Sequence, residues 1–75
     1  MDGVDAELLS RLKAWRLSQS RDQGVPAYVV LHDTTLAEIA RRRPRDLAAL
    51  ADIPGIGARK LERYGTSLLE AIGGA

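Results

Sequence analysis

The sequence predicts an all-α fold, and three observations support this prediction. Apolar residues recur at spacings of four and three near the start, as Leu8, Leu12 and Trp15 do, which aligns them along one face of a helix. The one strand-like stretch, residues 25–31, has no second strand to pair with, and a lone strand is not stable. Residues 54–57 read Pro-Gly-Ile-Gly between two apolar-spaced runs, which predicts a helix, a tight turn and a second helix.

The composition is that of one small domain. The 75 residues are 45% hydrophobic, and so small a core supports roughly 3–5 kcal/mol of stability. There is no cysteine, which excludes disulfides and thiolate metal sites and fits a reducing cytosol. No apolar run approaches the roughly 20 residues that span a bilayer, and the acidic start does not resemble a signal peptide. We therefore expect a cytoplasmic protein without membrane contact.

The charges are nearly balanced but unevenly distributed. Eleven basic and ten acidic residues give a net charge of +1, which is low for a domain that binds duplex DNA by charge alone. Seven of the basic residues fall between Arg41 and Arg63. Any affinity for nucleic acid should therefore be local, weak and sensitive to salt.

The first predicted helix runs from near Asp5, a suitable N-cap, to about Asp22, with Gly24 as a plausible stop. Trp15 is expected in the core rather than on a ligand platform. Residues 25–31 follow as an extended or single-turn segment. The core residues expected from this segment are Val29, Val30 and Leu31. Tyr28 should be half buried, with its hydroxyl in water.

The next predicted helix begins at Asp33 as the cap, or at a capping box of Thr35 and Glu38. It carries Leu36, Ile39 and Ala40 inward. It ends near Arg42, because Pro44 disfavours helical geometry in the residue before it. The basic cluster at this end comprises Arg41, Arg42, Arg43 and Arg45. Two interpretations remain open: these residues offset the helix dipole and aid solubility, or they contact phosphates.

Asp46 should cap a short helix that buries Leu47 and Leu50 and stops before Pro54. In the turn that follows, Ile53 and Ile56 can anchor in the core. The turn glycines permit close approaches and unusual backbone angles, and the helix start after them suits a phosphate. The alternative is that the glycines only make the turn.

The last predicted helix carries Leu61, Tyr64, Leu68 and Ile72 at spacings of three, four and four. Tyr64 lies on this stripe and is expected in the core. Gly65 costs about 1 kcal/mol relative to alanine, so it should bend the helix or split it in two.

Taken together, five stretches in the right order resemble an HRDC domain, the helical module found near the C-terminus of RecQ-type helicases, some UvrD-like helicases and RNase D. They read Leu-Lys-Ala-Trp-Arg at 12–16, Val-Pro-Ala-Tyr-Val-Val at 25–30, Asp-Thr-Thr-Leu at 33–36, Arg-Pro-Arg-Asp-Leu at 43–47, and Ile-Pro-Gly-Ile-Gly at 53–57 with Lys-Leu-Glu-Arg-Tyr-Gly at 60–65. The family often has proline where Ala27 stands, and serine or threonine near Asp46, which caps a helix equally well.

The resemblance implies a compact bundle of about five short helices, forming a single domain with its core at about 5–72 and flexible ends at 1–4 and 73–75. It implies no catalytic site, and an auxiliary role in which the module helps a parent enzyme engage single strands or junctions. Tyr28 matches a family tyrosine that resembles a single-strand contact in bacterial RecQ-type members. Lys60 matches the basic start of the last long helix.

Two functions follow as hypotheses. The first is a monomeric accessory domain of a DNA helicase, acting beside the helicase core of the same chain. It would bind single-stranded or junction DNA weakly, in repair or recombination, and would be associated with the nucleoid. Its candidate contacts are Tyr28, Arg41, Arg42, Arg43, Arg59, Lys60 and Arg63. The second is a protein-interaction module, which suits the near-neutral charge. A true helix-hairpin-helix that grips duplex DNA explains neither the Trp15 helix nor residues 25–31.

An enzyme is the weakest hypothesis. The single histidine, His32, stands beside Asp33 at a helix start and is interpreted as a turn residue. No catalytic triad, metal-ligand spacing or phosphate-binding loop is apparent. We therefore expect no cofactor and no metal.

Overall fold

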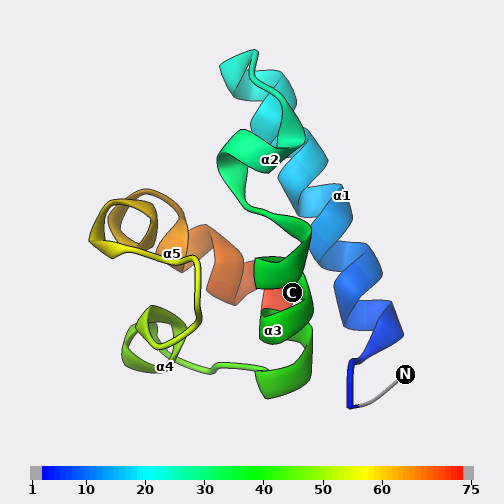
Figure 1. Ribbon diagram of the computed structural model, residues 1–75, viewed down its shortest axis with the longest axis vertical. Helices are drawn as coiled ribbons and strands as arrows, with labels where there is room; N and C mark the ends of the chain where they lie inside the picture. The colour runs from blue at the N-terminus through cyan, green and yellow to red at the C-terminus, as the bar shows by residue number, and fades with distance from the viewer. Residues whose placement is uncertain (1–2, 74–75) are drawn as a thin grey trace.

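Helices form the regular elements of residues 3–73, the part of the chain that the computed structural model describes. They are α1 (Ala6–Gln23), α2 (Ala27–Val30), α3 (Asp33–Arg42), α4 (Leu47–Ala51) and α5 (Ala58–Gly73). The long α1 packs against α2, α3 and α5, whereas α4 packs against α5 (Figure 1). The prediction of an all-α bundle of five short helices is therefore confirmed.

Local capping sets three helix ends as predicted, both ends of α1 and the start of α4. The Asp5 carboxylate accepts a hydrogen bond from the Leu8 amide at 3.0 Å and begins α1. Gly24 ends α1 in the left-handed region, with φ 66°. The Asp46 carboxylate accepts from the Ala49 amide at 2.8 Å and begins α4. Each of these contacts joins residues close in sequence, which is why the sequence alone predicts them.

The predicted start of α3 is wrong in its detail. His32, not Asp33, is the N-cap residue, and its side chain makes no capping bond. The Asp33 carboxylate instead pairs with the Arg16 guanidinium of α1 at 2.7 Å, a charge-assisted contact between two helices. The capping box is also absent, because Thr35 is buried and donates to the Pro54 carbonyl instead.

Residues 25–31 contain one helical turn that buries only part of its predicted set. Val30 and Leu31 are fully buried, but Val29 is 46% exposed and Tyr28 is 61% exposed. The predictions of a buried Val29 and a half-buried Tyr28 are therefore wrong. Successive residues of a helix point about 100° apart, so a single turn cannot direct all of them into one core.

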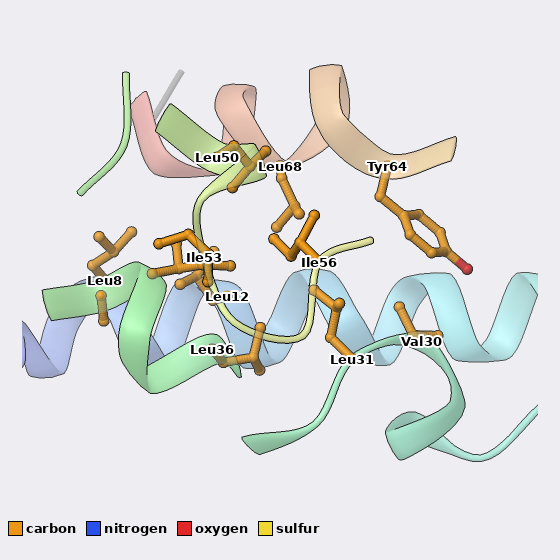
Figure 2. Packing of buried hydrophobic residues seen from close by; sticks show 12 residues of the cluster. Leu8, Leu12, Val30, Leu31, Leu36, Leu50, Ile53, Ile56, Tyr64 and Leu68 are labelled. Carbon is orange, nitrogen blue, oxygen red and sulfur yellow. The ribbon is translucent and has the colours of Figure 1, made fainter. Parts of the chain in front are cut away.

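Twelve apolar residues of the described chain make up the buried core (Figure 2). They are Leu8, Leu12, Val30, Leu31, Leu36, Ile39, Ala40, Leu50, Ile53, Ile56, Tyr64 and Leu68. Trp15 packs against this cluster from its margin, edge-on to the Tyr64 ring at 5.6 Å between centroids. Its indole N–H donates to the Ser67 hydroxyl at 2.8 Å, which joins α1 to α5.

The turn between α4 and α5 is anchored by two isoleucines and one threonine. Ile53 and Ile56 are 2% and 7% exposed, and Figure 2 shows both reaching into the layer between α5 and α1. The Thr35 hydroxyl donates to the Pro54 carbonyl at 3.2 Å. Gly55 has φ 97° and lies so close to Thr35 that a Cβ atom there would be 2.1 Å from its hydroxyl oxygen. Only glycine therefore fits this position.

Gly65 does not bend or split the last helix, contrary to prediction. Helix α5 is continuous, and Gly65 is buried beneath the side chain of Leu47. The missing Cβ lets α4 approach α5 closely. Leu47 itself stays 45% exposed, so its predicted burial is also wrong, because it covers α5 from outside rather than entering the core.

The predicted flexible ends fall partly outside the described residues. Residues 1–2 and 74–75 lie beyond them. Within the described part, Val4 packs against the core cluster and Gly73 is the last residue of α5.

Replacing Gly55 by alanine should destabilise the domain strongly. The positive φ alone costs about 1–3 kcal/mol for a side-chain-bearing residue, and the buried Thr35 must also move. Against a total of roughly 3–5 kcal/mol, we expect G55A to be largely unfolded at 37 °C by circular dichroism. Gly57→Ala is the matched control, because nothing lies within 4 Å of the place its methyl group would take and its φ is not positive. Equal losses of stability in the two variants would contradict the conclusion that the contact of Thr35 with Pro54 and Gly55 requires a glycine at position 55.

Stability should fall in acid through Asp5 and Asp33. The hydrogen bond from the Leu8 amide, helped by the Arg43 charge, lowers the pKa of Asp5 below its ordinary 3.8. The hydrogen bond from Arg16 lowers the pKa of Asp33 in the same way. A carboxylate with a lowered folded-state pKa stabilises the fold above its unfolded pKa, and this contribution is lost as pH falls through the folded value.

The urea midpoint should therefore hold steady down to about pH 5 and decline below about pH 4. The double variant D5N/D33N should be less stable than the parent at neutral pH and converge with it in acid. Parallel curves at all pH values would show that these carboxylates contribute no pH-dependent stability.

Candidate nucleic-acid interface

Three of the predicted basic residues come together in one hollow. Arg59, Lys60 and Arg63 lie on the first two turns of α5 and line a hollow of about 740 Å³. Gln23 at the end of α1 and Val29 of α2 form its other side. Glu62 and Tyr64 complete the lining. Residues from three helices thus surround a cationic depression with an exposed apolar edge.

Packing beneath this hollow holds its walls in place. The Tyr64 hydroxyl donates to the Gln23 side-chain oxygen at 2.9 Å, which ties α5 to the end of α1. The Arg63 guanidinium lies 5.6 Å from the centre of the Tyr64 ring, within the range of a cation–π contact. Ile53 and Ile56 anchor in the core the turn that leads into the first turn of α5, where Arg59 and Lys60 lie.

The electrostatics of this hollow favour an anion. Within residues 3–73, none of its three basic side chains has a carboxylate within 4.0 Å. The first amides of a helix have no intrahelical partner, and the helix dipole places partial positive charge at the same end. The three cations and the start of α5 therefore both attract a phosphate placed in this hollow.

The predicted arginines at the end of α3 are differently placed, because acidic residues hold them. Glu38 pairs with both Arg41 and Arg42, the latter at 3.1 Å between Nε and Oε2. Arg43, the C-cap of α3 with φ 51°, pairs with the Asp5 carboxylate at 2.8 Å. Each of the three guanidiniums thus already has a carboxylate partner. Such exposed pairs are weak and a phosphate can compete for them, but the local charge is much reduced.

The two basic clusters do not form one patch. Arg43 and Arg45 line a separate hollow with Leu69 and Ile72 near the C-terminal end of α5. Lys60 and Ile72 are about 18 Å apart along the helix axis at 1.5 Å per residue. The structure therefore separates the basic residues into an unpaired group at the start of α5 and a mostly paired group toward its end.

Tyr28 lies beside the α5 hollow rather than within it. Its ring faces a third hollow of about 440 Å³, which is lined by Arg16, His32 and Asp33 among others. The next residue along the chain, Val29, lines the Arg59–Lys60–Arg63 hollow. The single turn of α2 therefore forms the ridge between the two hollows.

Sequence interpretation missed three residues of these hollows. Val29 looks like a core residue in an apolar run, and Gln23 looks like an ordinary polar residue at a helix end. His32 is predicted to be only a turn residue, yet its ring lies against that of Tyr28. No helical spacing predicts this contact, because α2 ends at Val30 and both Leu31 and His32 have extended backbone conformations.

Other kinds of site find no support in the described part of the chain. No group of three or more His, Cys, Asp or Glu within residues 3–73 is arranged to hold a metal ion. Among the same residues, no helix has both the length and the apolar character needed to cross a membrane.

A protein-family model and several known helicases are similar in sequence to this chain. A family model described as the HRDC domain matches residues 5–72. The ATP-dependent DNA helicase UvrD2 of Mycobacterium tuberculosis is 59% identical over 71 residues, which is 95% of this chain and 10% of that protein. The ATP-dependent DNA helicase RecQ of Pasteurella multocida is 35% identical over 68 residues, which is 91% of this chain and 11% of that protein.

A solved structure described as D. radiodurans RecQ HRDC domain 3 superposes with a TM-score of 0.89 at 39% identity, covering 92% of this chain and 91% of that one. The chain thus spans about a tenth of the length of the curated helicases it matches, and almost the whole of an isolated domain. The family match, the sequence identities and the structural superposition agree, and the chain belongs to the HRDC domain family.

Proposed function

We propose that this chain is the non-catalytic accessory domain of an ATP-dependent DNA helicase, and that it holds single-stranded or structured DNA for the helicase core of the same polypeptide. The observation that carries the proposal is the group of unpaired cations Arg59, Lys60 and Arg63 in one hollow at the start of α5. The names of the UvrD2 and RecQ relatives support the helicase context. A role in repair or recombination, in the cytoplasm, follows from that context.

The mechanism begins with phosphate contacts. Arg59, Lys60 and Arg63 surround a depression that a phosphate can enter, and the α5 dipole adds to their field. Arg41, Arg42 and Arg43 contribute less, because contact with DNA requires them to leave their carboxylate partners.

Single-strand preference comes from the neighbouring ridge. Among residues 3–73, Tyr28 is the most exposed of the large apolar side chains, and its neighbour in the chain, Val29, lines the cationic hollow. A base on an aromatic ring contributes about 1–3 kcal/mol and is read without regard to sequence. Bases are accessible for such stacking only where they are unpaired, so single strands and frayed junctions should bind better than closed duplex.

The expected affinity is low. The net charge is +1, and three unpaired cations limit the number of phosphates neutralised. For a single strand, three phosphate contacts give a slope of about −2 in log affinity against log salt. A weak module of this kind acts as a tether: it raises the local concentration of DNA near a helicase core that does the chemistry.

A second candidate function is docking on a protein. Helix α4 exposes Leu47 at 45% together with Ala48, Ala49 and Ala51, so most of its apolar residues face outward. The hollow lined by Arg45 and Ile72 lies close by along the chain. This surface suits contact with the parent helicase or a repair partner, and titration with DNA separates the two functions.

Lys60→Ala should weaken single-strand binding, whereas Arg45→Ala should leave it nearly unchanged. Both variants remove one exposed or partly exposed cation and the same net charge, but only Lys60 lines the α5 hollow. We expect K60A to reduce affinity for a fluorescent thymine oligonucleotide about threefold to tenfold at low salt, and to make the salt slope shallower by about 0.7. Fluorescence anisotropy over a salt series measures both quantities.

A duplex of the same length, titrated in parallel, tests the mode of binding. Duplex affinity equal to single-strand affinity would favour a helix-hairpin-helix grip instead. Absence of any binding by the folded domain at submillimolar concentration would reject direct DNA contact and favour protein docking through α4.

A further inference from the structure

The hollow near the C-terminal end of α5 combines apolar and cationic side chains. Its volume is about 420 Å³, which lies within the range of roughly 300–1,000 Å³ that small-ligand sites occupy. Leu69 and Ile72 of α5 are partly buried and pack against the core cluster, and Pro44 is buried. The exposed Arg43 and Arg45 complete the wall opposite α5 in the chain. Within residues 3–73, no carboxylate side chain lines this hollow.

Both arginines have donors available for a carboxylate. Arg45 has no acidic side chain within 4.0 Å among residues 3–73. Arg43 pairs with Asp5 at 2.8 Å through one terminal nitrogen, and a guanidinium has five N–H donors in all. Asp46 follows Arg45 in the chain, but its carboxylate accepts from the Ala49 amide. The two guanidiniums can therefore receive an acidic ligand without losing a contact that the fold requires.

The end of α5 presents less negative charge than an uncapped helix end. The last carbonyls of a helix carry partial negative charge, which repels an anionic ligand. In this chain Arg11 of α1 donates to the carbonyls of Ala71 and Ile72, at 3.4 and 3.1 Å. A cation from another helix thus offsets the dipole beside the hollow.

The apolar surface continues from this hollow toward α4. Leu47 is 45% exposed and lies over Gly65. Leu69 and Ile72 follow Gly65 by four and seven positions, which places all three on one face of α5. An apolar side chain from another molecule can therefore contact both the hollow and the exposed leucine of α4.

We propose that this hollow binds a short acidic peptide segment of a partner protein. An aliphatic side chain of the segment packs against Leu69 and Ile72. Carboxylates on either side of it pair with Arg43 and Arg45, since arginine and carboxylate match in geometry as well as charge. The inference rests on the second candidate function, for which it names the surface and the chemistry of the partner. The apolar contact distinguishes such a segment from a phosphate backbone, which has no aliphatic side chain to offer.

A labelled peptide tests the two halves of this recognition. The probe is fluorescein-Gly-Asp-Leu-Leu-Asp-Gly-amide, titrated with the folded domain at low salt and followed by fluorescence anisotropy. Matched peptides with asparagine in place of aspartate, or serine in place of leucine, should each bind about fivefold more weakly or worse. Arg45→Ala should weaken binding of the probe about threefold to fivefold, as expected for one exposed ion pair. Lys60→Ala removes the same charge outside this hollow and should bind the peptide like the parent.

Gly73 offers a pair of variants that leave the packing undisturbed. It lines the hollow as the last residue of α5, and no described atom lies within 4 Å of the place its Cβ would take. Gly73→Glu adds a carboxylate and should weaken binding of the probe about fivefold or more, because like charges repel. Gly73→Lys adds a cation of similar length and should bind at least as tightly as the parent. Circular dichroism checks that both variants are folded.

Amide shifts of the ¹⁵N-labelled domain locate the bound peptide. Shifts confined to residues 43–47 and 69–73 would support the inference. Shifts centred on residues 59–63, with weaker binding by K60A, would overturn it, because the peptide would then bind as an anion in the candidate nucleic-acid interface. Equal binding by the asparagine peptide, equal binding by G73E and G73K, or no binding to the folded domain at millimolar concentration would overturn it as well.

The two proposals fail separately. Loss of peptide binding leaves the DNA proposal standing, because that proposal depends on the titration of K60A with a single strand. Failure of the parent domain to bind any single strand would reject the DNA proposal and leave the peptide site to be decided by R45A and the Gly73 variants.

Discussion

The clamp between Thr35 and the Pro54–Gly55 turn is the constraint on which the rest of the structure depends. The Thr35 hydroxyl holds the Pro54 carbonyl, and a glycine with φ 97° is needed beside it. This contact joins α3 to the turn that leads into α5, across 19 positions of sequence. It fixes the start of α5, and therefore the location of the cationic hollow. The Thr35–Pro54 hydrogen bond and Gly55 therefore matter both for the fold and for the position of the candidate binding site.

Helix α2 shows how a very short element can organise a surface. Its single turn buries Val30 and is followed by the buried Leu31, so the side chains of Tyr28 and Val29 must face solvent. Tyr28 then borders one hollow and Val29 the other. Arg16 secures the end of this turn through the Leu31 carbonyl. The exposure of Tyr28 and Val29 is therefore a consequence of burying Val30 and Leu31.

Charge pairing, rather than charge number, distinguishes the basic clusters. The arginines at the end of α3 outnumber those at the start of α5, yet Glu38 neutralises two of them within α3. Asp5 neutralises a third, Arg43, and this pair helps fasten the end of α3 to the start of α1. The cluster at the start of α5 has no such partners within residues 3–73. Membership of the HRDC family establishes the fold. The distribution of partnered and unpartnered charges in this chain points to the start of α5 as its candidate interface.

The sequence by itself determined the all-helical class, the helix ends at Asp5, Gly24 and Asp46, and most of the core, because capping and apolar periodicity act over a few neighbouring residues. Only the tertiary structure decided which basic residues are free, since the partner of Arg43 is Asp5, far away in the sequence at the start of α1. The same holds for Asp33, Val29 and Gly65, whose local patterns predict a cap, a core residue and a break. Asp33 pairs with Arg16 on α1 instead of capping α3. Val29 is exposed because the single turn of α2 packs Val30 against the core. At Gly65 the missing side chain lets α4 approach α5 closely.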